Sequence, residues 1–200
     1  MRLLRFFITA LLVVCTHAHA QSGDATARVK TFYATLLETM KDAKRLGVEG
    51  RYKKLAPVIS ASFDLPAMTR IAVGPAWTSF TPEQQAAITA AFARMSVATY
   101  ASRFDGYDGE RFEVDPKVGE RGADRVVNTR IVSGASEPVT LNYLMRSSGS
   151  DWKIVDVYLS GTISELAARR SEFAAIIKSG GPDALASTLK QRGDKLLAGG

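Results

Sequence analysis

The chain has 200 residues, of which 46% are hydrophobic and 23% charged, an ordinary composition for one soluble globular domain. Its formal net charge of +6 at pH 7 is modest for this length. The charge excludes a nucleic-acid-binding protein that relies on a dense lysine and arginine stripe, and no internal repeat or long linker indicates a second domain.

The first twenty residues have the features of a secretory signal peptide. Met1–Arg5 carries two arginines, Phe6–Val14 is a largely apolar run, and Ala18–Ala20 has the small-x-small pattern of a cleavage site. The run is too short to cross a hydrocarbon core about 30 Å thick, although an uncleaved anchor is the alternative. We therefore predict a cleaved signal over residues 1–20 and a single domain over 21–200.

Cleavage would leave a chain without cysteine or histidine, because Cys15, His17 and His19 are the only residues of these types. The mature chain, with a formal charge of +4, would have no disulfide, thiolate nucleophile, Ser-His-Asp triad or histidine- or cysteine-based zinc site. We therefore expect a protein that is not an enzyme and has no cofactor or metal.

Two helices are predicted at the start of the mature chain. The first covers residues 24–45 and ends before Gly47, and the second covers residues 49–62, where Pro57 is expected to introduce a kink. The apolar stripe of the first helix consists of Val29, Phe32, Tyr33, Leu36, Leu37 and Met40.

Two further helices follow. Asp64 is placed to cap a short helix over residues 65–73, which Gly74–Pro75 stops. Thr81–Gln84 reads as a capping box with proline at the first helical position, and it opens the longest helix, which runs to about Phe104.

After Gly106 the hydrophobic period changes from that of a helix to that of a strand. Four runs of strand length are joined by short connections: 111–118, 125–132, 139–146 and 152–159. Short connections favour an antiparallel meander. We predict an α+β fold: a helical part over about 24–105, a curved four-stranded antiparallel sheet over about 110–160, two C-terminal helices over about 162–197, and an apolar cavity between sheet and helices.

The segment Trp152–Phe173 joins the last strand to a helix without a gap. Apolar residues occupy both alternating positions of Trp152–Leu159, which predicts a strand that is apolar on both faces. Ser160–Gly161 supplies a turn, and Thr162 with Glu165 forms a capping box for a helix to residue 179. A second helix is expected over 182–197, after a break at two glycines.

Asp156 is the one carboxylate in this apolar strand. A buried carboxylate needs a partner, and we expect Arg130 or Arg146 to provide it.

Other charged groups have alternative interpretations. Asp105, Asp108 and Glu110 form an acidic loop that either binds calcium or is a solvated turn, and they lack the ligand spacing of an EF-hand. Arg169–Arg170 either contacts a lipid phosphate, a membrane or an acidic partner, or lies on a solvated helix face paired with neighbouring glutamates.

Two blocks of the sequence carry a family pattern. Phe63–Gly109 begins with Phe-Asp, has a Gly-x-x-Trp turn and ends its long helix near a tyrosine, and the second block is Trp152–Phe173. Both blocks, in this order, resemble the MlaC or toluene-tolerance family of periplasmic lipid-binding proteins. Within the second block, ISELAARRSEF at Ile163–Phe173 is most similar to the hopanoid-associated HpnM subgroup.

The resemblance implies a periplasmic carrier that shields the apolar part of a phospholipid or hopanoid between the inner and outer membranes. It also implies an inner-membrane ABC-type lipid transport complex and an outer-membrane partner, with transient membrane contact. Such a carrier is physically necessary because each methylene exposed to water costs about 0.8 kcal/mol.

Ten residues in the matched blocks and on the neighbouring strands are candidates for the cavity wall: Ile71, Val73, Trp77, Phe92, Tyr100, Phe104, Tyr143, Leu144, Val157 and Ile163. Two other functions are considered. An envelope adaptor without a ligand would have a filled core, and an envelope hydrolase based on carboxylates would bring two acids, such as Asp64 and Asp156, into a cleft.

Overall fold

The structure of the chain is a computed structural model that describes residues 17–134, 137–149 and 151–199. Its helices are α1 (His17–Lys41), α2 (Ala43–Ser62), α3 (Leu65–Val73), the 3-10 helix η1 (Gly74–Ser79), α4 (Pro82–Arg103) and α5 (Glu165–Leu197). Its strands are β1 (Arg111–Arg121), β2 (Asp124–Val132), β3 (Val139–Ser148), β4 (Asp151–Leu159) and β5 (Ile163–Ser164). Residues 1–16 of the predicted signal peptide lie outside the described residues.

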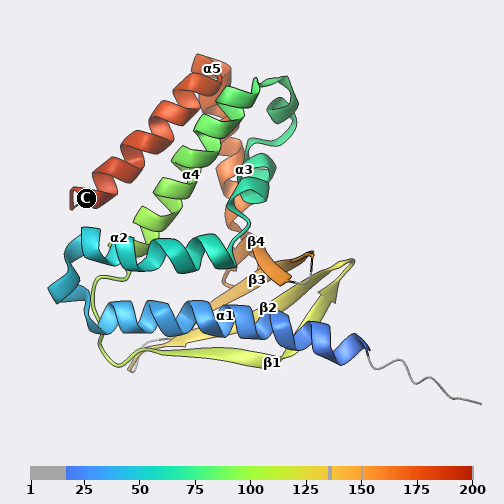
Figure 1. The fold of residues 1–200 in the computed structure, drawn as a ribbon, viewed down its shortest axis with the longest axis vertical. Coiled ribbons are helices and arrows are strands. Elements are labelled where there is room, and N and C mark those ends of the chain that lie inside the picture. The colour runs from blue at the N-terminus through green and yellow to red at the C-terminus, as the bar shows by residue number, and fades with distance from the viewer. Residues whose placement is uncertain (1–16, 135–136, 150, 200) are drawn as a thin grey trace, which may run out of the picture.

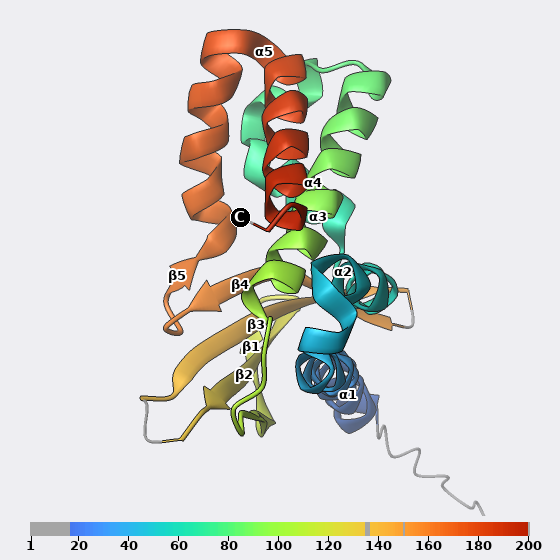
Figure 2. The same cartoon turned by 90° about the vertical axis from the view of Figure 1, so that its left-hand side faces the viewer.

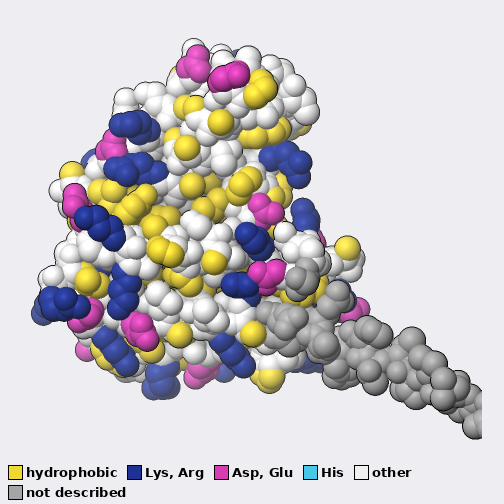
Figure 3. Space-filling model, in the orientation of Figure 1, with side chains coloured by type: hydrophobic (Ala, Val, Ile, Leu, Met, Phe, Trp, Pro, Cys, Tyr) yellow, Lys and Arg dark blue, Asp and Glu magenta, His cyan; other side chains and the backbone are white. Residues whose placement is uncertain are grey.

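The strands form one antiparallel sheet in the order β1-β2-β3-β4-β5, which confirms the predicted α+β class and the meander. The two-residue strand β5 is an addition to the four that were predicted. Helix α1 runs along the sheet with α2 beside it, and α3, α4 and α5 stand above the sheet as a second group (Figure 1). Basic and acidic side chains are interspersed over the face in Figure 3, as the modest net charge suggests.

The helix starts follow the sequence signals closely. The Asp64 side chain accepts a hydrogen bond from the backbone N–H of Ala67 at 3.0 Å, and Thr81 and Gln84 form both bonds of the capping box. Gly74 caps the C-terminus of α3, so both predicted ends of this helix are confirmed. None of the described helices is long and apolar enough to span a bilayer.

The first two helices contain one of the two predicted irregularities. The predicted break at Gly47 is confirmed, since this glycine has a φ of 61° inside α2. Helix α2 continues through Pro57, and the kink at this proline stays a prediction. Pro57 and Lys53, whose carbonyl loses its partner to the proline, both lie on the exposed side, where water can satisfy that carbonyl.

The interpretation of β4 as a strand with two apolar faces is also wrong. Met145 pairs with Ile154, whereas Leu144 pairs with Asp156, so a β-bulge inserts one extra residue into β4. Beyond the bulge, Val157 lies opposite Tyr143. The alternation therefore changes phase within the strand, and residues at even and odd positions point to the same side of the sheet.

The start of α5 differs from the predicted capping box. Ser164, not Thr162, is the N-cap, and its hydroxyl accepts a hydrogen bond from the N–H of Ala167 at 3.0 Å. Pairing of Ile163–Ser164 with the end of β4 keeps these residues extended, which delays the helix. The predicted break between two C-terminal helices is confirmed at Gly181, where φ is 72° and ψ is −170°.

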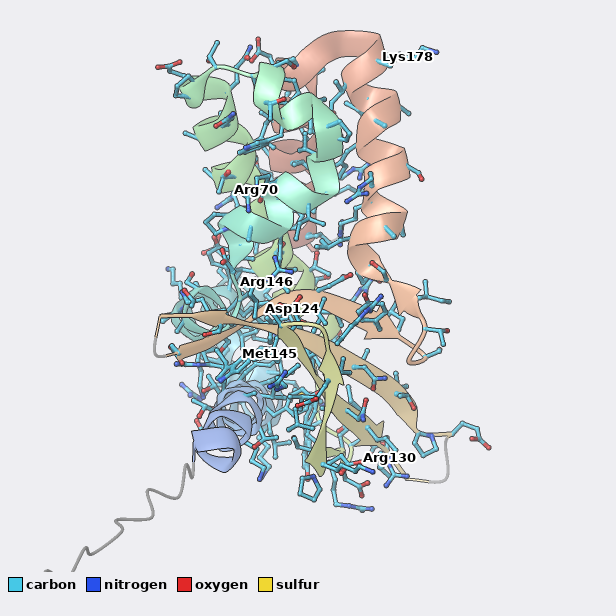
Figure 4. The ribbon with its side chains drawn as sticks, turned by 90° about the vertical axis from the view of Figure 1, so that its right-hand side faces the viewer. Arg70, Asp124, Arg130, Met145, Arg146 and Lys178 are labelled. Carbon is cyan, nitrogen blue, oxygen red and sulfur yellow. The ribbon has the colours of Figure 1, made fainter. Side chains whose placement is uncertain are left out.

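Asp156 is buried, as expected, but neither predicted arginine is its partner. Its carboxylate accepts hydrogen bonds from the Ser164 hydroxyl at 2.6 Å and from the N–H groups of Val157 and Leu166 at 2.8 and 3.3 Å. Arg130 pairs with Glu113, and Arg146 pairs with Asp124 across β2 and β3 (Figure 4). Asp156 thus connects β4 to the first turn of α5.

Three tyrosines connect α1, α4 and the sheet: Tyr33 and Tyr143, which are buried, and Tyr100, which is partly buried. Their rings belong to an aromatic cluster with Phe32, which contacts Tyr100 and Tyr143 edge-on. The Thr129 hydroxyl donates to a backbone carbonyl, so the Tyr33 hydroxyl donates to Thr129 at 2.6 Å. Burial raises the pKa of Tyr33 to about 12, and burial also raises the pKa values of Tyr100 and Tyr143.

Replacing Asp156 by alanine should lower the free energy of unfolding by about 1–3 kcal/mol, because the N–H groups of Val157 in β4 and Leu166 in α5 lose a buried acceptor. Urea unfolding followed by circular dichroism would measure the change. Arg130→Ala, which removes an exposed ion pair, is the control and should cost less than about 1 kcal/mol. Equal losses in both variants would contradict the assigned role.

The raised pKa of Tyr33 predicts that the protein loses stability at alkaline pH. Burial favours the neutral hydroxyl, so the contribution of Tyr33 is fully present below pH 10, its unfolded pKa, and is lost as the pH rises through about 12. We expect urea midpoints to be flat to pH 9 and to fall steeply above pH 10. Tyr33→Phe, which has no ionisable hydroxyl, should show a shallower fall, and an identical pH profile would contradict the assignment.

Candidate functional site

A cavity of about 740 Å³ lies between the sheet and the helices, a size within the range of about 300–1,000 Å³ that is typical of small-molecule sites. Helices α2, α4 and α5 contribute to its wall, together with α3, β2, β3 and β4. Figure 2 shows the segments that frame it: β5 and the start of α5 on one side, and the chain that follows α4 on the other. Its apolar lining residues are Met40, Ile59, Phe63, Leu65, Met68, Phe92, Tyr100, Phe104, Tyr107, Ile131, Val139, Leu141, Val157, Leu159 and Leu166.

The sheet contributes a continuous apolar row to this wall. Ile131 pairs with Val139 across β2 and β3, and Leu141 pairs with Leu159 across β3 and β4. Paired residues share a face of a sheet, so these four side chains point to the same side. One residue pair further along, Tyr143 lies on the same face but is completely buried against α1. A single sheet face therefore packs against α1 at one end and lines the cavity at the other.

Hydrogen bonds from two arginines, Arg51 and Arg170, connect the helices around the cavity. The guanidinium of Arg51 is buried and donates to the carbonyls of Ala101 and Ala43 at 2.7 and 3.0 Å, which joins α2 to the end of α4. On the opposite side, Arg170 donates two hydrogen bonds to the carbonyl of Ile71, which joins α5 to α3. These bonds hold the helical walls at the two sides of the cavity.

Four of the ten predicted wall residues line the cavity: Phe92, Tyr100, Phe104 and Val157. Phe92 and Tyr100 come from α4, Phe104 ends that helix, and Val157 faces them from β4. Tyr100 and Phe104 are stacked, with ring centroids 5.7 Å apart. Their contact with a ligand stays a prediction.

The other six lie elsewhere. Val73 is buried at the end of α3, Ile71 has its carbonyl bound by Arg170, and Trp77 packs against Phe80. These three positions lie on the α3–η1 side, away from the cavity lining, since the helical period of α3 turns Leu65 and Met68 toward it instead.

The remaining three are on the sheet. Tyr143 is packed beneath α1, and Leu144, one residue along, points to the opposite face. Ile163 is exposed on β5, where it pairs with the lining residue Leu159. Leu144 was misplaced because the sequence did not show which strand face meets the helices.

Several lining residues were not among the candidates, including Met40, Ile59, Leu141 and Leu166. Met40 and Ile59 belong to the apolar stripes of the first two helices, so their burial had a sequence signal. No sequence signal showed that they line a cavity, because an apolar stripe that packs against a filled core has the same pattern.

Charged groups surround the cavity mouth. Three cations line it, and Arg169 forms an ion pair with Glu165 at 3.7 Å while Lys44 and Arg103 contribute from α2 and α4. The acidic groups are Asp105, Asp108, Glu110, Glu137 and Glu165. Among the described residues, no group of acidic, cysteine or histidine side chains is arranged to hold a metal ion. Within the acidic loop, the Glu110 carboxylate accepts a hydrogen bond from the N–H of Asp108.

Neither of the two carboxylates proposed for hydrolysis lines the cavity. Asp64 caps α3, and Asp156 binds the first turn of α5. Each accepts backbone N–H bonds that a structural role explains. The described cavity therefore consists of an apolar interior with a mixed-charge mouth, an arrangement suited to holding an amphipathic molecule.

Comparisons with known proteins agree with this geometry. A solved phospholipid-binding protein from Ralstonia solanacearum, determined in complex with a phospholipid, is similar over 86% of this chain and 98% of its own, with 29% identity and a TM-score of 0.75. No curated protein matches the chain. The family model described as MlaC protein matches residues 30–191. The chain therefore belongs to the MlaC family.

Proposed function

We propose that the chain is a periplasmic carrier that binds a phospholipid by enclosing its acyl chains in the cavity. The observation that carries this proposal is the cavity of about 740 Å³, whose wall is mostly apolar and whose charged lining residues all keep some exposure to solvent. The phospholipid bound to the similar Ralstonia solanacearum protein supports the same ligand class.

The energetics favour shielding of this kind. Each methylene removed from water contributes about 0.8 kcal/mol, so an acyl chain with about fifteen methylenes gains roughly 12 kcal/mol on leaving water. An apolar wall supplies this gain without an acid, a base or a metal. A carrier function accounts for the site without any chemical step.

The mouth suits the polar end of such a ligand. Arg103 and Arg169 carry guanidinium groups, which bind phosphate oxygens through paired N–H donors, and Lys44 adds a third cation. The headgroup would stay at the surface, where water solvates it, while the chains extend toward Phe92 and Leu166.

Transport across the periplasm extends this proposal. The signal-like residues 1–20 support export, and the family supports handover between an inner-membrane lipid transport complex and an outer-membrane partner. A hopanoid is a second possible cargo, because a fused-ring hydrocarbon also requires apolar walls.

The direct test is native mass spectrometry of the protein purified from its own cell envelope without detergent. We expect a mass increment that dissociates as phospholipid, and a hopanoid would instead be identified by its own mass. Protein that is folded but carries no lipid, and takes none from phospholipid vesicles, would overturn the carrier proposal in favour of an adaptor.

A matched pair of variants tests whether the described cavity is the binding site. Leu159 and Val118 are both half-buried strand residues, but only Leu159 lines the cavity. Leu159→Glu should reduce the bound lipid at least about tenfold, because a carboxylate in the apolar wall opposes acyl-chain burial. Val118→Glu should retain lipid, with circular dichroism showing that both variants are folded. Equal retention would place the lipid elsewhere.

A further inference from the structure

The large hydrophobic side chains that are exposed in the described part of the chain gather at one place. They are Tyr107, Val139 and Ile163, with 44%, 53% and 58% of their surface accessible. Tyr107 and Val139 line the cavity, and Ile163 pairs with the lining residue Leu159. All three therefore surround the cavity mouth, and we call them the apolar rim.

The strand register places two of these side chains, Val139 and Ile163, on the same face of the sheet. Leu141, Leu159 and Ile163 are successive partners across β3, β4 and β5, and strands lie about 4.8 Å apart. Val139 is two residues from Leu141 and points to the same side. The row that lines the cavity thus continues outward to Val139 and Ile163 at the surface.

The third member of the apolar rim comes from a different segment. Tyr107 lies in the loop between α4 and β1, where the Lys41 ammonium is 5.4 Å from the centroid of its ring. Lys44 and Arg103 line the mouth nearby. The tyrosine is therefore both an apolar group and a neighbour of cations that can meet lipid phosphates.

We propose that the apolar rim docks the cavity mouth onto the surface of a lipid bilayer, so that cargo passes between bilayer and cavity without crossing water. This inference rests on the proposed carrier function and adds the surface through which the lipid is exchanged. Shallow insertion of Tyr107, Val139 and Ile163 would make the apolar row of the sheet continuous with the acyl region of the bilayer.

The composition of the rim favours a bilayer over a folded protein partner. Its three apolar side chains come from separate segments, and charged groups such as Arg103 and Glu137 line the mouth with them. A protein partner would have to bury or pair these charges in a complementary surface. The headgroup layer is wet and itself charged, so it accepts tyrosine, lysine and arginine beside inserted apolar groups.

The test measures the rate at which lipid-free protein takes up a fluorescent phospholipid from protein-free vesicles made of equal parts phosphatidylethanolamine and phosphatidylglycerol. Tyr107→Ser, Val139→Ser and Ile163→Ser combined should slow uptake by about tenfold, because the contact loses most of its apolar burial. The final amount bound should stay unchanged in Ile163→Ser alone, because Ile163 is the rim residue that does not line the cavity.

Two substitutions at Ile163 provide a matched control. Ile163→Ser alone should slow uptake, whereas Ile163→Trp should not, because tryptophan partitions well into the bilayer interface. In addition, Ile163→Trp should show a blue shift of its fluorescence when vesicles are added. The exposure of Ile163 makes both replacements compatible with folding.

Each result has a defined meaning. An unchanged uptake rate in the folded triple variant would overturn bilayer docking, and a slowing seen only with native envelope membranes would overturn it in favour of a protein partner. If the unchanged protein takes no lipid from protein-free vesicles but carries lipid when purified from its own envelope, bilayer docking is overturned and the carrier function stands. If it carries no lipid from either source, the carrier function itself fails. If Ile163→Ser alone loses bound lipid at equilibrium, this residue belongs to the binding site and its docking role is overturned.

Discussion

The cavity depends on a sheet face that one helix covers only in part. Helix α1 packs on this face through Phe32 and Tyr33, which contact Tyr143 at the covered end. At the other end, Leu141 and Leu159 continue the same face and line the cavity, to which α1 contributes Met40. The aromatic cluster therefore both anchors the sheet and sets the inner limit of the cavity, because no side chain can enter the space that these rings occupy.

The helical wall opposite the sheet is held by polar contacts at its ends and apolar packing in its middle. Asp156 orients the first turn of α5, and Arg51 attaches α2 to the end of α4. Between these points, Phe92 on α4 packs edge-on against Phe173 on α5. The hydrogen bonds of Asp156 and Arg51 fix the positions of the helix ends. The contact between Phe92 and Phe173 packs α4 and α5 against each other.

Much of this architecture was predictable because its signals are local. The caps at Asp64 and Thr81, the breaks at Gly47 and Gly181 and the strand meander depend on neighbouring residues. The bulge beside Asp156 was missed, since an inserted residue in a strand resembles an apolar residue on a second face. The cavity wall was predicted only in part, because burial against a neighbour and exposure to a cavity leave the same hydrophobic pattern.

The size of the cavity argues that its apolar interior serves a guest molecule. Protein interiors are otherwise close-packed, and an apolar wall that meets neither side chains nor a ligand loses dispersion contacts. The wall is therefore suited to a guest that fills it, and exposed lining residues such as Arg103 and Tyr107 open it to water. An amphipathic cargo satisfies both conditions, because its tails fill the interior while its headgroup meets water at the mouth.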